Sequence, residues 1–170
     1  MRRLFDLLGL KVLTSTDGIE IGTICDILIK NDTMLKVQGF ILITIDEKEH
    51  LFLPWEEISI GKDCILVHSR ESPDKFDLKN LEKDFLLKDT ILDLRVYTND
   101  GKELGLVKEL FLSDSNRLVD GIACSDGLIN DLLKGRTLYP LIGPIKINDD
   151  NLYVSKECIE EAIYRKEVEI

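Results

Sequence analysis

Side chains able to do acid–base or metal chemistry are few in this sequence of 170 residues. Its two histidines are His50, which follows a charged segment containing Asp46 and Glu49, and His68, which ends a predicted strand. A general base or a metal ligand needs a fixed and sheltered geometry, which a charged turn rarely provides. We interpret the segment before His50 as a solvated turn, and a triad assembled in space around His68 stays an open alternative without support.

The acidic residues also give no clear candidate for a catalytic or metal-binding site. The run 149–151, Asp-Asp-Asn, lacks the alternating ligands and distant Glu of an EF-hand loop and predicts a hairpin turn instead. We found no glycine-rich phosphate loop, nucleophile elbow or zinc-protease motif. The sequence therefore predicts a protein that is not an enzyme and needs no metal or cofactor. A hydrolase that uses Asp126, Asp131, Asp149 and Asp150 is the alternative.

The four cysteines are far apart in the sequence, at positions 25, 64, 124 and 158. Zinc sites usually contain pairs of cysteines only a few residues apart, and no such pair occurs here. All except Cys158 lie among aliphatic residues, which favours buried free thiols over a disulfide framework. Free thiols are typical of a reducing compartment, so we expect a cytoplasmic protein.

The composition is that of an acidic globular chain. Lys and Arg number 22 against 32 Asp and Glu, for a net charge of −10, and 44% of residues are hydrophobic. A negative surface repels phosphate backbones, so direct nucleic-acid binding is disfavoured and a protein partner is expected. Asp6 interrupts the apolar stretch after Arg2 and Arg3 too early for a signal peptide. No apolar run approaches the ~20 residues of a membrane-spanning helix, so we expect no membrane insertion.

An internal repeat organises the chain. Residues 17–27, Asp-Gly-Ile-Glu-Ile-Gly-Thr-Ile-Cys-Asp-Ile, correspond to residues 100–110, Asp-Gly-Lys-Glu-Leu-Gly-Leu-Val-Lys-Glu-Leu. Further blocks correspond in the same order: 35–40 with 118–122, 52–54 with 138–140, and 60–67 with 147–154. Chance could produce one Asp-Gly pair but not four ordered blocks, so the chain contains two copies of one module.

Each copy is predicted to be mainly β. The Asp-Gly pairs at 17–18 and 100–101 lie between β-prone runs and predict tight turns. Gly22 and Gly105 interrupt a strand pattern, which predicts a bulge or bend where a side chain would collide with a neighbouring strand. The composition, with 2 Ala against 28 Leu and 20 Ile, also favours strands over helices. Five or six short strands in each copy predict a small barrel.

Two short helices are expected in addition. Ser72 and Pro73 have the residue types of a helix start, which predicts a helix in the linker between the copies. Ser155 is a candidate cap for a second helix that carries Ile159 and Ile163. The expected organisation is a first module at 1–72, a helical linker at 73–87, and a second module with a C-terminal helix at 88–170.

The duplicated block Asp-Gly-x-x-x-Gly-x-[Ile/Val]-x-[Asp/Glu]-[Ile/Leu], followed by a strand and a Leu-Pro or Tyr-Pro step, resembles the PRC-barrel family. This family includes the cytoplasmic domain of the photosynthetic reaction-centre H subunit and the C-terminal domain of the ribosome maturation factor RimM. The resemblance implies two tandem small barrels that serve as docking surfaces, with no shared catalytic residues. By analogy, it places the partner in ribosome assembly or RNA processing. The second copy departs from the first in a longer connection at 126–136.

Two features predict protein-binding surfaces. Trp55 directly follows a proline and would be a strong anchor if exposed, the alternative being a residue that covers the core. Leu132, Leu133, Lys134 and Arg136 form an apolar and positive tip on an acidic chain, which a helical turn ending at a glycine explains equally well. We expect a non-catalytic docking module, with a self-associating structural protein, a homodimer through barrel edges, as the alternative.

Overall fold

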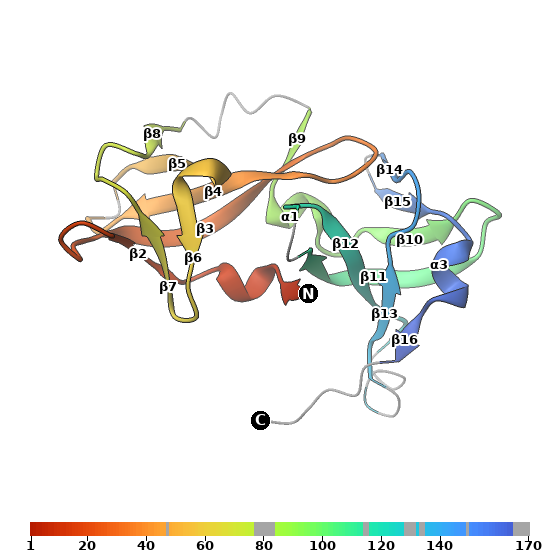
Figure 1. Ribbon diagram of the computed structural model, residues 1–170. Coiled ribbons are helices and arrows are strands. Elements are labelled where there is room, and N and C mark those ends of the chain that lie inside the picture. Colours follow the sequence, from red (N-terminus) through yellow and green to blue (C-terminus); the bar gives the residue numbers. More distant parts are fainter. Residues whose placement is uncertain are drawn as a thin grey trace. The chain divides into compact units, whose positions relative to one another are not determined.

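The chain forms two compact units in the computed structural model (Figure 1). The structure describes residues 1–46, 48–76, 84–113, 116–127, 132, 135–148 and 150–164. We call Asp6–Lys30 together with Val37–Lys88 the N-terminal unit. We call Met1–Phe5, Asn31–Lys36 and Asp89–Ile170 together the C-terminal unit. Two short segments from the beginning of the sequence thus belong to the unit formed mainly by its second half.

The N-terminal unit contains one sheet. Its strands along the chain are β2 (Lys11–Thr14), β3 (Glu20–Lys30), β4 (Val37–Thr44), β5 (His50–Pro54), β6 (Ile58–Ile60), β7 (Cys64–Val67), β8 (Asp74–Lys75) and β9 (Phe85–Leu86). They pair in the order β6-β7-β2-β3-β4-β5-β8, and β9 pairs with β3 outside this path. The β2–β7 pair is parallel and the other pairs are antiparallel.

The C-terminal unit repeats this arrangement. Its strands are β1 (Arg2–Arg3), β10 (Arg95–Thr98), β11 (Glu103–Leu112), β12 (Val119–Ser125), β13 (Thr137–Pro140), β14 (Lys146–Ile147), β15 (Asn151–Val154) and β16 (Ile163–Tyr164). They pair in the order β14-β15-β10-β11-β12-β13-β16, and β1 pairs with β11 outside this path. The strand order matches that of the N-terminal unit strand for strand, which confirms the mainly β architecture and the duplication.

Neither set of described strands closes into a barrel, which corrects the expectation of closed barrels. In each unit the pairing is an open path, from β6 to β8 and from β14 to β16. These end strands contain only two or three residues. Short end strands have few backbone groups that could pair with another strand, so each described sheet remains open.

Helices contribute only single turns to the described chain: η1 (Phe5–Leu7), η2 (Trp55–Glu57), α1 (Lys88–Ile91) and α3 (Glu157–Glu160). The expected C-terminal helix is present as α3, but the Ser155 side chain does not cap it, and Ile163 belongs to β16. No helix in the described ranges is long and apolar enough to span a membrane.

The linker helix expected at 73–87 is not found in the described part of that segment. β8 pairs with Leu51 and Phe52 of β5, and β9 pairs with Ile29 and Lys30 of β3. A short helix has little stability of its own, and pairing with a sheet readily overrides such a weak local preference. Residues 77–83 lie outside the described residues.

The repeated glycines behave as predicted. Gly18 and Gly101 have φ values of +70° and +90°, so both occupy the left-handed region that the turns require. A β-bulge lies next to Gly22 and next to Gly105, where the pairing with β2 and with β10 shifts. A Cβ at Gly22 would lie 2.3 Å from the carbonyl oxygen of Ile43 in β4. A Cβ at Gly105 would lie 2.2 Å from that of Ser125 in β12, so both bulges need a residue without a side chain.

A threonine hydroxyl holds each of the two turns. The side chain of Thr14 donates to Asp17, and that of Thr98 donates to Asp100 Oδ1 at 2.5 Å. Both threonines are 1% exposed, and the hydrogen bond from each hydroxyl lowers the pKa of its aspartate. The two Asp-Gly turns are therefore fixed by the same kind of contact, from a buried threonine hydroxyl to the turn aspartate.

A buried carboxylate holds the first residues of the chain in the C-terminal unit. Arg2 and Arg3 of β1 pair with Leu112 and Phe111 of β11. Glu109, which is 4% exposed, accepts the Phe5 N–H at 3.0 Å and the Arg3 Nε at 3.3 Å. Charge-assisted bonds of this kind are stronger than neutral ones, so they compensate for burying the carboxylate.

The N-terminal unit contains the matching contact. Asp26, which occupies the position of Glu109 in the repeat, accepts the Lys88 N–H at 2.8 Å just after β9. It also accepts the next backbone N–H, from Ile27, as Glu109 accepts that of Leu110. Each unit thus uses the same acidic position to bind the backbone that follows its added short strand.

Candidate functional site

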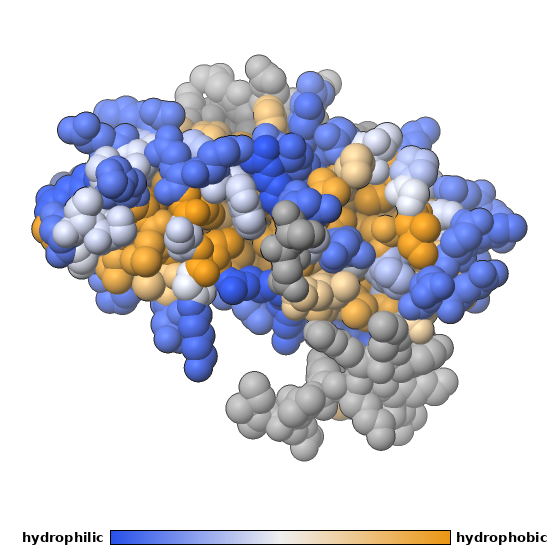
Figure 2. Space-filling view, in the orientation of Figure 1, coloured by the Kyte–Doolittle hydropathy of each residue, from blue (hydrophilic) through white to orange (hydrophobic). Residues whose placement is uncertain are grey.

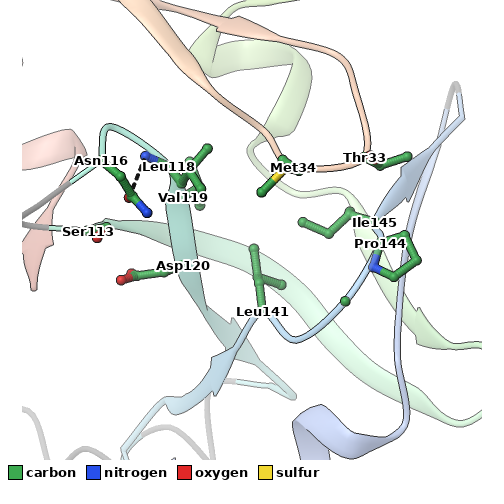
Figure 3. Close-up of a pocket in the computed structure, with 11 residues that line it drawn as sticks. Thr33, Met34, Ser113, Asn116, Leu118, Val119, Asp120, Leu141, Pro144 and Ile145 are labelled. Atoms are coloured by element: carbon green, nitrogen blue, oxygen red, sulfur yellow. Dashed lines mark hydrogen bonds between the residues drawn. The ribbon is translucent and has the colours of Figure 1, made fainter.

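A groove of about 390 Å³ lies in the C-terminal unit and is a candidate for a binding site. Apolar side chains dominate its lining, and Figure 3 shows those of Met34, Leu141 and Ile145 directed toward the same open space. The lining residues are Thr33, Met34, Ser113, Asn116, Leu118, Val119, Asp120, Leu141, Gly143, Pro144 and Ile145. This combination of an apolar floor and a few polar groups is typical of recognition sites.

Backbone hydrogen bonds fix the groove's walls. The Ile145 N–H donates to the Thr33 carbonyl at 3.0 Å, and the Val119 N–H donates to the Leu35 carbonyl at 3.1 Å. These two bonds fix the backbone on either side of Met34. The Leu141 N–H donates to the Asp120 carbonyl at 2.8 Å, which fixes the opposite wall. The groove therefore exists before any partner binds.

Two residues near the groove adopt the left-handed backbone conformation without being glycine. Leu35 has a φ of +48° and Arg117 a φ of +51°, and each directly precedes a partner in the isolated bridge between Lys36 and Leu118. This conformation costs an L-residue about 1–2 kcal/mol, so surrounding contacts must hold it in place. The side chain of Leu35 is fully buried, and this burial supplies part of the compensation.

Exposed apolar side chains accompany the groove. Met34 is 55% exposed and Ile142, beside the lining residue Leu141, is 39% exposed. Figure 2 shows hydrophobic residues at the surface between hydrophilic ones on the face in view. Exposed apolar side chains next to a depression are characteristic of surfaces that bind other molecules.

The two copies differ at the groove residue Leu141. Pro54 pairs with Gly39 in the first copy, and Pro140 pairs with Gly121 in the second, so the next residues correspond: Trp55 and Leu141. Trp55 is half-buried, begins η2 and stacks on Phe40 with ring centroids 6.0 Å apart. The second copy has the smaller Leu141 at this position and no helical turn after it. The two copies therefore differ at this position both in the size of the side chain and in the backbone that follows it.

Those sequence-predicted binding residues that the structure describes lie outside this groove. Trp55 belongs to the N-terminal unit, and neither Leu132 nor Arg136 lines the groove. Leu132 is 85% exposed, as an anchor residue would be. Leu133 and Lys134 lie outside the described residues. Sequence reasoning missed Met34 and Leu141, although a comparison of Trp55 with its counterpart in the second copy carries the signal.

A second cleft, of about 530 Å³, has a mixed-charge lining in the same unit. Arg136 lines it together with Asp126, Arg95, Glu103 and Lys108. Arg95 Nη1 lies 3.2 Å from Glu103 Oε1, so these charges neutralise each other. Exposed ion pairs of this kind are worth little and leave no strong field for a charged ligand. We therefore consider this cleft a weaker candidate than the apolar groove.

The residues considered for chemistry are not gathered into a site in the described structure. His50 begins β5 and pairs with Ile43 in β4. Within the described ranges, no cluster of three or more His, Cys, Asp or Glu side chains could hold a metal ion. Asp46 is an exposed turn residue whose pKa is lowered by the hydrogen bond from the Thr44 hydroxyl. Of the acidic residues in the hydrolase alternative, Asp131 and Asp149 lie outside the described residues.

All four cysteines are free thiols, as predicted. Cys124 and Cys158 are buried, whereas Cys25 and Cys64 are only half-buried, which corrects the expectation that all are buried. Burial raises the pKa of Cys124 to about 12. Burial, and to a smaller extent the negative charge of Asp26, also raises the pKa of Cys25. High pKa values disfavour the reactive thiolate, so neither residue has the properties of a nucleophile.

The structure shows a duplicated small β domain whose C-terminal unit carries an apolar groove. The sequence model of the PRC-barrel domain matches the chain twice, over residues 1–72 and 83–156. The protein therefore belongs to the PRC-barrel family and carries two tandem copies of its domain. A search of curated proteins found no match.

Proposed function

We propose that this protein is a non-catalytic docking module that binds a partner protein through the apolar groove of the C-terminal unit. The observation that carries the proposal is Met34, a large apolar side chain that is 55% exposed above a preformed groove. Leaving apolar area in water costs about 25 cal/mol per Å², which binding a partner would recover. A rigid backbone around the groove reduces the entropy lost on binding.

The charges around the groove favour a protein over a nucleic acid. Asp120 is the one ionisable residue among the described groove-lining residues, and the chain has a net charge of −10. Nucleic-acid sites need several Lys or Arg residues close to the phosphates. A cytoplasmic location and a role beside ribosome assembly or RNA processing, as in the family member RimM, are further parts of this proposal and rest on analogy alone.

Self-association through sheet edges has less support. The end strands of the described sheets are β6, β8, β14 and β16, and each contains only two or three residues. Short edges provide few hydrogen bonds to a second copy, whereas the groove offers an apolar surface. We therefore rank the partner protein first.

Site-specific photo-crosslinking in cells that express the protein tests this proposal. A photoreactive amino acid replaces Met34 in one variant and Ile45 in a control variant. Ile45 is 65% exposed and belongs to the N-terminal unit, so it matches Met34 in size and exposure but not in position. We expect the Met34 position to crosslink to a defined protein that the Ile45 position does not capture.

Mass spectrometry then identifies the crosslinked protein and the contacting peptide. The same set of crosslinks from both positions would contradict docking at the groove. Crosslinks from Met34 only to further copies of this chain would contradict a separate partner and favour the self-associating alternative.

A further inference from the structure

Each compact unit is assembled from both copies of the family domain. The first copy, residues 1–72, provides β1 and the segment Asn31–Lys36 to the C-terminal unit. The second copy, residues 83–156, provides β9 to the N-terminal unit. We propose that the copies are also exchanged between molecules, so that the first copy of one molecule assembles with the second copy of another. The partner that fits this interface is a second molecule of the same protein.

The site that β1 occupies is defined by backbone pairing and by burial. Arg2 and Arg3 form a two-residue ladder with β11, and the Leu4 N–H donates to the Leu110 carbonyl at 2.8 Å. The Leu4 side chain is fully buried, and that of Arg3 forms an ion pair with Glu109, which is 4% exposed. These contacts depend on the sequence of the segment and not on the molecule that it comes from. The β1 of a second molecule therefore fits this site equally well.

Two further sets of contacts join the copies in the same way. In the C-terminal unit, the Val119 N–H of the second copy donates to the Leu35 carbonyl of the first. In the N-terminal unit, β9 of the second copy pairs with β3 of the first, and Asp26 accepts the Lys88 N–H. When the copies of two molecules are exchanged, every contact that is broken forms again in the other pair. Exchange of this kind is a low-cost route to a dimer for that reason.

Concentration decides between the closed monomer and the exchanged dimer. Both forms contain the same contacts between the copies, so exchange costs mainly the entropy of joining two molecules. Residues 73–82 connect the two family matches, and a short connection gives its ends an effective concentration of about 1 mM. We therefore expect about one dimer for every ten monomers at about 0.1 mM protein, and a ratio about tenfold higher at about 1 mM.

Exchange would change which molecule lines each side of the groove. Met34 comes from the first copy, whereas Leu141 and Ile145 come from the second. In the exchanged dimer, each groove is thus lined by two molecules. The groove is complete in both forms, so this inference and the docking function do not depend on each other. The association uses β3 and β11 inside the sheets, and not the short end strands.

Disulfide trapping between two different variants tests the inference. Arg2 lies opposite Leu112 in the β1–β11 pair, and Lys30 lies opposite Phe85 in the β3–β9 pair. Opposite residues have Cα atoms about 4.5–5.5 Å apart, a separation that a disulfide can bridge. Arg2→Cys is mixed with Leu112→Cys, and Lys30→Cys with Phe85→Cys, one variant of each mixture being extended by a mass tag. Each mixture is refolded together from urea under reducing conditions at about 0.1 mM and is then oxidised.

We expect a disulfide-linked heterodimer from both mixtures on a non-reducing gel. Leu112 is 3% exposed, so a β1 that is seated on β11 can reach its position but a random collision cannot. Arg2→Cys mixed with Ile45→Cys is the matched control, because Ile45 is 65% exposed and is not paired with β1. Mixtures of each variant with the wild type control for the four native thiols.

Double variants that carry both cysteines of a pair in one chain show that the strands pair and that the proteins fold. An intrachain disulfide in both double variants, with no heterodimer from either mixture, would overturn the inference. A heterodimer from the β1–β11 mixture alone would mean that only β1 exchanges, and would also overturn it. So would equal yields of heterodimer from the Ile45 control. Lys30 is exposed and Phe85 half-buried, so that mixture decides the question even if Leu112→Cys does not fold.

Discussion

At the scale of single residues, the molecule repeatedly uses one buried or half-buried polar group to fix a short piece of backbone. Thr14 and Thr98 hold the two Asp-Gly turns, and Asp26 and Glu109 hold the backbone after β9 and β1. A polar group that is buried without a partner is costly, so these positions tolerate few residue types. The acidic position that Asp26 and Glu109 share in the repeat therefore has a structural role.

Cys124 gives a prediction about pH at this scale. Its pKa is raised from 9.0 to about 12 because burial disfavours the charged thiolate. The folded state therefore holds this proton more tightly than the unfolded state. Its contribution to stability is complete below pH 9.0 and is lost as the pH rises toward 12. The free energy of unfolding should fall by about 1.4 kcal/mol per pH unit in this window from Cys124 alone.

Urea unfolding of the wild type and of Cys124→Ala, at several pH values in this window, measures that contribution. The variant starts less stable because it leaves a cavity, but it should lose stability less steeply with pH. Other groups that titrate at alkaline pH affect both proteins alike, so the difference in slope isolates the thiol. Parallel slopes would show that burial does not hold this proton.

At the scale of elements, the bulges at Gly22 and Gly105 set the course of β3 and β11. We expect Gly105→Ala to destabilise the protein by about 2–4 kcal/mol, because its Cβ would collide with the Ser125 carbonyl and the residue has a φ of +107°. Gly18→Ala is the matched control, since its φ is +70° but nothing lies within 4 Å of its Cβ. It should cost only about 1 kcal/mol, from backbone strain alone.

Thermal and urea unfolding of both variants provides the comparison. Equal losses would mean that backbone strain, and not the close approach of β12, explains the glycine at position 105. Gly22 has no positive φ, so Gly22→Ala tests the collision with Ile43 without that strain.

The elements also show how much the sequence could predict. The repeat, the turns at 17–18 and 100–101, and the bulge glycines follow from local residue types, because each depends on backbone geometry within a few residues. The linker helix is not found at 73–76 or 84–87, the described parts of that segment, because β8 and β9 gain their hydrogen bonds there from distant strands, which no local pattern specifies. Barrel closure likewise depends on long-range pairing of the end strands.

The candidate site was only partly accessible from the sequence. The groove depends on Leu141, where the loss of a tryptophan relative to the first copy is visible in the sequence. It depends equally on Met34, which reaches this groove because Asn31–Lys36 belongs to the C-terminal unit. The repeat shows which segments have similar sequences, but similar segments also have similar pairing preferences. The repeat therefore does not show which of the two compact units a given segment belongs to.

At the scale of the whole molecule, the family copies and the compact units do not coincide. β1 is the first strand of the copy at 1–72, yet it pairs with β11 in the C-terminal unit. β9 lies in the copy at 83–156, yet it pairs with β3 in the N-terminal unit. The first copy also provides Asn31–Lys36, the connection between β3 and β4, to the C-terminal unit. Each copy thus contributes its first strand to the unit formed mainly by the other copy.

This exchange predicts that the two units unfold together. Leu4 is fully buried in the C-terminal unit, and Leu4→Ala should destabilise that unit by about 2–4 kcal/mol. When the C-terminal unit unfolds, it releases Asn31–Lys36 and so loosens the ends of β3 and β4 in the N-terminal unit. The single tryptophan, Trp55, reports on the N-terminal unit alone. We therefore expect its fluorescence transition in urea to move to lower concentration in Leu4→Ala, in step with the transition seen by circular dichroism.

Glu103→Gln is the control for this experiment, because it breaks only the exposed ion pair with Arg95 in the C-terminal unit and should leave both transitions in place. Two separate transitions in Leu4→Ala, with that of Trp55 unchanged, would mean that the exchanged strands do not couple the units. Coincident transitions that shift together would mean that the two compact units form one cooperative folding unit. Small independent domains ordinarily unfold in separate two-state transitions, so the shared segments would account for the coupling.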